Sequence, residues 1–164
     1  MYFAHSYGAV VAALAHRAHR AAALVFVEPA FYDLARGEPS VETHIQAIED
    51  AHGALQRDGL WAFWQRVRPL MFGGPASSSS WERERATAES FSARSLPWGH
   101  GIDLEWFAGT PTLVVTGGWN EQYEIIAARF IEVGAEHLVL PGHGHRPMDH
   151  PEFVRAVSEF RRGC

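Results

Sequence analysis

The sequence contains one cysteine and no lysine. Because the cysteine is Cys164, the last residue, the chain can form neither an intrachain disulfide nor a cysteine-based zinc site. All 14 basic residues are arginine, a bias typical of a GC-rich genome, and they form no basic stripe. With a net charge of −5 the chain lacks the electrostatic footprint of nucleic-acid binding, so no nucleic-acid partner is expected.

Long hydrophobic runs are also missing. No run reaches about 18 apolar residues, which excludes a membrane-spanning helix on length. Residues 9–15 are apolar, but no basic residue precedes them, so they do not match a signal peptide. The composition, 47% hydrophobic and 20% charged over 164 residues, is that of one compact domain. We therefore expect a cytoplasmic protein with no membrane partner.

Short apolar runs alternate with helical patterns along most of the chain. The continuous runs at 24–27 and 112–116 are typical of parallel strands buried on both faces, and 137–140 is a third candidate. Helices are expected at 7–19, 120–133 and 151–161, the second capped by Asn120. This alternation predicts an α/β fold with a parallel sheet and right-handed crossovers.

Between the first two strand candidates lies a stretch of helical and aromatic character. Helices are expected over 41–57, with Ser40 as the cap, over 60–71, and over 81–94. We expect the aromatic residues here to hold the helices together, with a few facing a substrate pocket. They are Trp61, Phe63, Trp64, Phe72, Trp81, Phe91, Trp98, Trp106 and Phe107.

Two short motifs carry chemistry. Residues 4–8, Ala-His-Ser-Tyr-Gly, match a nucleophile elbow, a sharp strand-to-helix turn that exposes a serine hydroxyl, here Ser6. Near the other end, residues 142–147 read Gly-His-Gly-His-Arg-Pro and offer His145 as the base that a serine nucleophile needs. His5 is expected to pack beside the elbow.

These features resemble the α/β-hydrolase family, from the elbow to the C-terminus of that fold. The resemblance implies a partial hydrolase fold with a half-sheet of about four parallel strands. Residues 1–32 and 108–164 would form the core and 33–107 a helical cap. The family's strands one to four, with the loop that donates a second oxyanion amide, have no counterpart here, so the chain is expected to be truncated.

The resemblance also assigns roles. Ser6 would be the nucleophile, His145 the base, and the backbone amide of Tyr7 an oxyanion donor. The family's usual acid position, after the strand at 112–116, holds Asn120, which cannot supply a negative charge. Glu28, at the end of the strand at 24–27, is the preferred acid, and Glu124 is the alternative. Glu121 and Asp33 are further candidates.

A metal site competes for the same histidine loop. His143, His145, Asp149 and His150 lie within eight residues, but their spacing does not match common zinc patterns, so no metal and no cofactor are expected.

Two functions follow. The first is a serine hydrolase that cleaves an ester-type or related small apolar substrate through an acyl-enzyme. The second is a catalytically inactive fragment or binding module. In both, the strand before Ser6 would be an exposed sheet edge, where a second copy or a missing N-terminal half could pair.

Overall fold

The computed structural model describes residues 1–164 and divides into two compact units. Met1–Gly37 and Pro97–Cys164 form the first unit, and Glu38–Leu96 form the second. The second unit lies inside the stretch 33–107 that is expected to be a cap. None of the helices is both long and apolar enough to cross a membrane.

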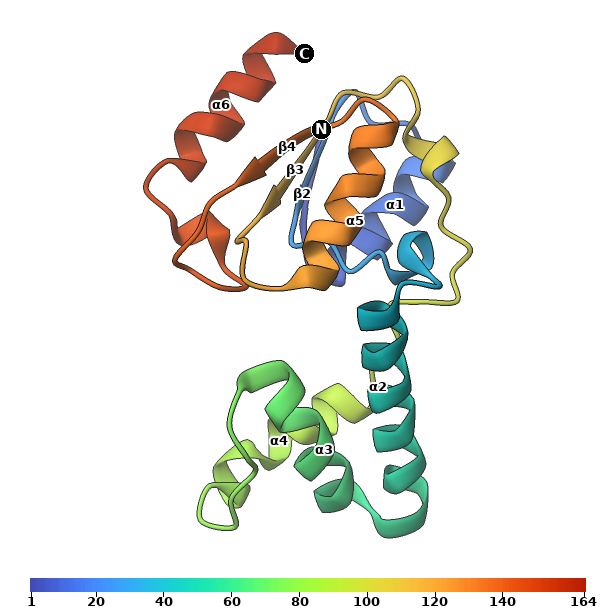
Figure 1. The fold of residues 1–164 in the computed structure, drawn as a ribbon, viewed down its shortest axis with the longest axis vertical. Coiled ribbons are helices and arrows are strands. Elements are labelled where there is room, and N and C mark those ends of the chain that lie inside the picture. Colours follow the sequence, from blue (N-terminus) through green and yellow to red (C-terminus); the bar gives the residue numbers. More distant parts are fainter. The chain divides into compact units, whose positions relative to one another are not determined.

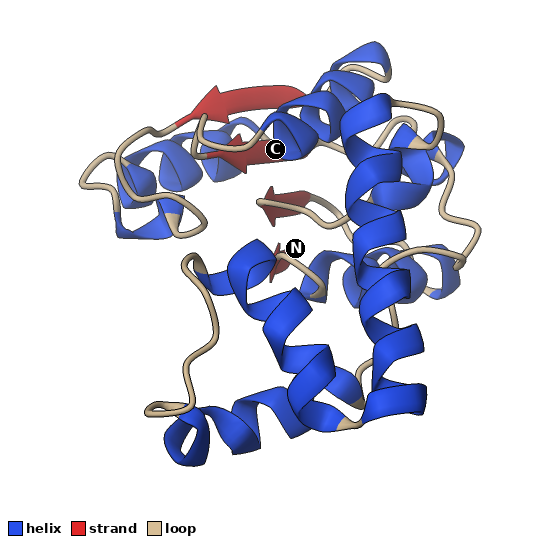
Figure 2. Ribbon diagram, turned by 60° about the horizontal axis from the view of Figure 1, so that its bottom comes forward, coloured by secondary structure: helices blue, strands red, loops and turns tan.

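The first unit is built on one parallel sheet of four strands in the order β1-β2-β3-β4 (Figures 1 and 2). This sheet confirms the predicted α/β fold class and its half-sheet of about four strands. The strands are β1 (Tyr2–His5), β2 (Leu24–Val27), β3 (Thr112–Thr116) and β4 (Glu136–Val139).

Three helices cover the sheet. In Figure 1, α1 (Gly8–Ala18) and α5 (Glu121–Glu132) lie on one face and α6 (Phe153–Gly163) lies on the other. Because the strands are parallel, their carboxyl ends meet at one edge of the sheet, and the connections there carry the chemistry discussed below. The first unit also contains three short 3₁₀ helices, η1 (Tyr32–Ala35), η2 (Leu104–Phe107) and η3 (Pro147–Asp149).

Strand β2 is buried on both faces. Val25 and Val27 belong to the cluster that includes Phe153 and Phe160 of α6. Side chains alternate along a strand, so Phe26 points to the opposite face. It packs there against three further rings, Phe31, Phe107 and Phe130. The continuous apolar run at 24–27 is thus explained by two separate layers of core.

Strand β1 forms one edge of the sheet. It pairs with β2 alone, through the register from Tyr2↔Leu24 to His5↔Val27. The side chains of Met1 and Phe3 are each 50% exposed. The edge therefore combines unpaired backbone groups with exposed apolar side chains.

Several element boundaries match the sequence predictions. Strands β2 and β3 have the predicted bounds, and Asn120 caps α5 by accepting a hydrogen bond from the Gln122 amide at 2.9 Å. Strand β4 begins one residue early, at Glu136. The prediction that Ser40 caps its helix is wrong, because that helix already begins at Pro39, where proline suits the first turn.

The second unit consists of α2 (Pro39–Asp58), α3 (Leu60–Phe72) and α4 (Trp81–Ser92). Its aromatic residues pack on one another across these helices, which accounts for their number. The ring pairs are Trp61 with Trp81, Trp64 with Phe72, and Phe72 with Phe91.

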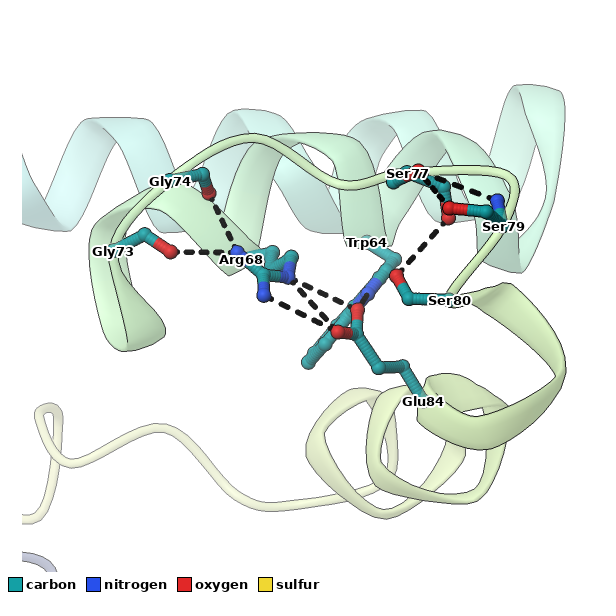
Figure 3. A network of polar contacts seen from close by, with 8 residues as sticks. All are labelled: Trp64, Arg68, Gly73, Gly74, Ser77, Ser79, Ser80 and Glu84. Carbon is teal, nitrogen blue, oxygen red and sulfur yellow. Dashed lines mark hydrogen bonds and ion pairs between the residues drawn. The ribbon is translucent and has the colours of Figure 1, made fainter.

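A polar network ties α3, α4 and the loop between them (Figure 3). The carboxylate of Glu84 accepts hydrogen bonds from Nε1 of Trp64 at 2.7 Å and from Nε of Arg68 at 3.0 Å. These donors hold the pKa of Glu84 below its usual value, with Arg68 the larger cause. Arg68 also donates to the carbonyls of Gly73 and Gly74, at 2.6 and 2.9 Å. One arginine thus fixes the start of the loop at 73–80.

Candidate active site

Ser6 lies in a strained turn between β1 and α1. Its φ of 54° is in the left-handed region, which is unfavourable for a residue with a side chain. The turn is held by the Ser6 amide, which donates to the carbonyl of Val27 at 2.9 Å, and by the Ala9 amide, which donates to the Ser6 carbonyl at 3.0 Å. Such a turn is the backbone geometry of a nucleophile elbow.

The amide of Tyr7 follows Ser6 at the N-terminus of α1. None of the backbone hydrogen bonds of this turn uses that amide as a donor. Amides in the first turn of a helix have no partner within the helix and favour an anion. The Tyr7 amide is therefore available to a developing negative charge beside Ser6.

Glu28 and His145 form a contact between two neighbouring loops at the same edge of the sheet. Nδ1 of His145 lies 3.3 Å from Oε2 of Glu28, whose side chain is completely buried. Because an ionised carboxylate can only accept, this contact places the proton of a neutral His145 on Nδ1 and leaves Nε2 free to take a proton.

The Glu28 carboxylate is held by two further donors. The amide of Gly117 donates to Oε1 at 2.6 Å, and Nε1 of Trp119 donates to Oε2 at 2.9 Å. Glu28 also has a positive φ, 46°, at the end of β2. A buried charge is tolerated when it is hydrogen-bonded on several sides, and here the loop after β3 supplies those bonds.

Gly117 allows the loop after β3 to approach the histidine loop. A Cβ placed at residue 117 would overlap the carbonyl oxygen of Gly144, and it would also lie 2.9 Å from the ring of Trp119. The close approach therefore requires glycine, and it brings His145, the next residue after Gly144, towards Glu28.

Three rings surround the imidazole of His145. The ring of Tyr123 is stacked on it at a centroid distance of 5.2 Å and an angle of 28°. Those of His5 and Trp119 lie at 4.6 and 6.0 Å. Nε2 of His5 is also 2.9 Å from the carbonyl oxygen of His145, and burial lowers the pKa of His5. These contacts fix the plane of the His145 ring.

Two tyrosines of the first unit, Tyr123 and Tyr32, are almost completely buried. The hydroxyl of Tyr32 donates a hydrogen bond to Oε1 of Gln122 at 3.3 Å. Burial raises the pKa of Tyr123 and brings the pKa of Tyr32 to about 12, so both phenols are protonated at neutral pH.

The other candidate acids lie elsewhere. Glu124 accepts from the Gly118 amide at 3.1 Å and lies 3.6 Å from Nε2 of His137, a different histidine. Asp33 accepts from three backbone amides, those of Gly99, His100 and Ile102. Glu121 is exposed in the first turn of α5. Of the four carboxylates considered, Glu28 is the one that contacts His145.

The histidine loop shows no metal-binding cluster of three or more ligand side chains. Asp149 forms an ion pair with Arg146, whose Nε lies 2.6 Å from Oδ2. The rings of His143 and His150 pack edge to face at 5.6 Å.

Sequence reasoning missed the contacts of Tyr123 with His145 and of Trp119 with Glu28. Trp119 follows two glycines at the end of β3, next to the position of the family's usual acid, so its place in the sequence was a usable signal. Nothing in the local sequence distinguishes Tyr123 from a core aromatic residue. Both contacts depend on how the loops converge.

Known proteins resemble this chain in sequence and in fold. The sequence model described as "Alpha/beta hydrolase family" matches residues 3–157. No curated protein matches the chain. The crystal structure of an alpha/beta hydrolase from Sphaerobacter thermophilus is similar, with a TM-score of 0.55 and 20% sequence identity. The match covers 97% of this chain and 66% of that one, so the chain spans just under two thirds of the neighbour's length. The chain belongs to the alpha/beta hydrolase family.

Proposed function

We propose that the chain carries the active site of a serine hydrolase that cleaves small carboxylic esters through an acyl-enzyme. Ser6 is the nucleophile, His145 the general base, and Glu28 the acid that orients His145. The contact of 3.3 Å between Nδ1 of His145 and the buried carboxylate of Glu28 supports this proposal most strongly. A histidine so oriented presents its other nitrogen as a base, which is what a serine needs to attack a carbonyl carbon.

The reaction has two balanced steps. First, Oγ of Ser6 bonds to the ester carbon while its proton passes to Nε2 of His145, and that proton then leaves with the alcohol. Second, water attacks the acyl carbon, its proton passes through Nε2 to Oγ of Ser6, and the carboxylic acid departs. Glu28 stays ionised and stabilises the imidazolium that forms in each step.

The tetrahedral intermediates carry negative charge on the former carbonyl oxygen. The Tyr7 amide is proposed as a donor to this oxygen, because it follows Ser6 at a helix N-terminus and has no backbone acceptor. Its hydrogen bond would strengthen as the charge develops.

The rings around His145 support a substrate that is apolar near the reacting bond. We further propose that the helical insertion between β2 and β3 serves as the cap of this enzyme. The supporting observations are its place in the chain and its aromatic content.

The test is covalent labelling of the full chain with a fluorophosphonate probe. Ser6 should be labelled, and Ser6→Ala should abolish the label. Ser95→Ala, at an exposed serine in the second unit, is the matched control and should label normally. If the wild-type chain shows no adduct at Ser6 at any probe concentration, the proposed function is wrong.

A second candidate function is a non-catalytic module that pairs through β1. The observation that favours it is the unpaired edge of that strand, with Met1 and Phe3 each half exposed. Edges of this kind pair readily with other chains. Unlabelled Ser6 together with stable self-association would favour this function over hydrolysis.

A further inference from the structure

Trp119 donates a hydrogen bond to the same oxygen of Glu28 that contacts His145. Nε1 of Trp119 lies 2.9 Å from Oε2 of Glu28, and Nδ1 of His145 lies 3.3 Å from that oxygen. The other oxygen, Oε1, accepts from the Gly117 amide at 2.6 Å. A carboxylate oxygen has two lone pairs, so the indole and the imidazole together occupy the acceptor sites of Oε2.

The indole of Trp119 is held by ring contacts, although 50% of the residue is exposed. Its ring lies 6.0 Å from that of Tyr123 and also 6.0 Å, edge to face, from that of His145. The rings of Tyr123 and His145 are stacked on each other at 5.2 Å. Three rings thus contact one another in pairs, which limits how the indole N–H can turn away from Oε2.

The two donors to Oε2 oppose each other when His145 takes up a proton. The indole N–H and the Nδ1–H of the imidazole point at one oxygen, so the positive ends of both bonds lie near each other. A proton on Nε2 spreads positive charge over the imidazole, and a positive end nearby disfavours that charge. The indole also draws on the negative charge of Oε2, which is the charge that stabilises an imidazolium.

Three other titratable groups lie beside His145 and are independent of the indole N–H. The ring of His5, from β1, is 4.6 Å away, and burial lowers the pKa of His5. Burial raises the pKa of Tyr123, from α5. Arg146, the next residue in the chain, forms an ion pair with Asp149. These groups are common to the wild-type chain and to a variant that lacks the indole N–H.

We infer that Trp119 is a positioning residue whose indole N–H shares Oε2 of Glu28 with His145 and so limits how strongly Glu28 stabilises the imidazolium. This inference rests on the proposed function and adds a residue to it. Its consequence is that His145 stays unprotonated, and able to accept the Ser6 proton, down to a lower pH than Glu28 alone would allow.

Trp119→Phe tests the inference, because it removes the N–H and keeps an aromatic ring. The measurement is the second-order rate of fluorophosphonate labelling of Ser6 from pH 5.5 to pH 9. Labelling requires an unprotonated His145, so its rate rises with pH to a plateau. We expect the pH of half-maximal labelling to increase by about 0.5–1 unit in Trp119→Phe. Labelling at pH 6 should therefore slow by about 3- to 10-fold, with a smaller difference at pH 9.

Tyr2→Phe is the matched control. It also removes one hydrogen-bond donor from an aromatic side chain, since the hydroxyl of Tyr2 donates to the carbonyl of His19 at 3.4 Å. Tyr2 is the first residue of β1, at the opposite end of that strand from Ser6. The pH of half-maximal labelling should be the same in Tyr2→Phe as in the wild-type chain.

The outcomes separate the inference from the proposed function. If wild-type Ser6 is labelled and the half-maximum of Trp119→Phe is unchanged or lies at lower pH, the inference is overturned and the proposed function stands. Equal slowing at every pH is such a result. If wild-type Ser6 is never labelled, both are overturned. Should Trp119→Phe fail to fold, 3-benzothienylalanine placed at residue 119 replaces the N–H by sulfur and keeps both rings, and the same two outcomes apply to it.

Discussion

Nδ1 of His145 lies 3.3 Å from Oε2 of Glu28, although 117 residues separate the two in the chain. Glu28 follows the end of β2 and His145 lies in the loop after β4, so strand β3 lies between their two strands in the sheet. The loop after β3 also contacts Glu28, because Gly117 and Trp119 donate hydrogen bonds to its carboxylate. The contact therefore depends on three loops at once.

Glu28→Gln should remove the charge while keeping the size of the side chain. The imidazolium loses its partner, and the Gln amide cannot satisfy the Gly117, Trp119 and His145 donors together. We expect the labelling rate of Ser6 to fall about 10³-fold or more. Stability should fall by about 1–3 kcal/mol. Labelling kinetics and urea unfolding measure these two effects. Glu124→Gln is the control, and a larger loss of labelling there would identify Glu124 as the acid.

Gly117→Ala should push the histidine loop away from β3. The added methyl group overlaps the Gly144 carbonyl, which is backbone and cannot rotate aside. We expect a loss of about 1–3 kcal/mol in stability, together with slower labelling of Ser6. Gly163→Ala is the matched control, because a Cβ there meets nothing within 4 Å. Equal unfolding temperatures for the two variants would contradict the expected clash.

Stability should decrease as the pH falls below about 6.5. Burial lowers the pKa of three histidines, His5, His44 and His137, from the ordinary value of 6.5. The unfolded chain then binds protons at a higher pH than the folded chain does. The free energy of unfolding is therefore fully retained above pH 6.5 and is lost as the pH drops through the lowered pKa values.

His137→Gln removes the contribution of one of these histidines to the pH dependence of the free energy of unfolding. Urea unfolding from pH 7.5 to pH 5 should show a flatter dependence for this variant than for the wild-type chain. His19→Gln, at an exposed histidine, should leave the dependence unchanged. An unchanged slope in His137→Gln would show that protonation of His137 does not contribute to it.

Phe3→Lys should weaken self-association through β1. The wild-type edge is apolar and unpaired, so we expect the chain to associate at high concentration, and a charged edge side chain opposes such pairing. Sedimentation velocity over a concentration series measures this. Val154→Lys is the control, because Val154 is 72% exposed but lies on α6. If the wild-type chain is monomeric at high concentration, the proposal that it self-associates through β1 is wrong.

The strands could be predicted from the sequence where burial on both faces produces a continuous apolar run, as in β2 and β3. Strand β4 is shifted by one residue because its outer positions are exposed and the apolar pattern is weaker. Ser6 could be proposed because its turn matches the elbow motif ending in Gly8, and His145 because Gly142 and Gly144 mark its loop. The stacking of Tyr123 on His145 could not, since an aromatic residue in a helix gives the same local pattern whether it faces the core or a neighbouring loop.

Asn120 bears on whether the acid of the proposed site could lie after β3 instead of after β2. Its side chain accepts from the Gln122 amide and so faces its own helix. An aspartate at this position would accept the same hydrogen bond from the Gln122 amide. Its carboxylate would then cap α5 instead of contacting an imidazole. We therefore expect that Asn120→Asp cannot rescue a chain that has lost Glu28. Moving the acid from the end of β2 to the end of β3 would therefore also require a different conformation of the turn before α5.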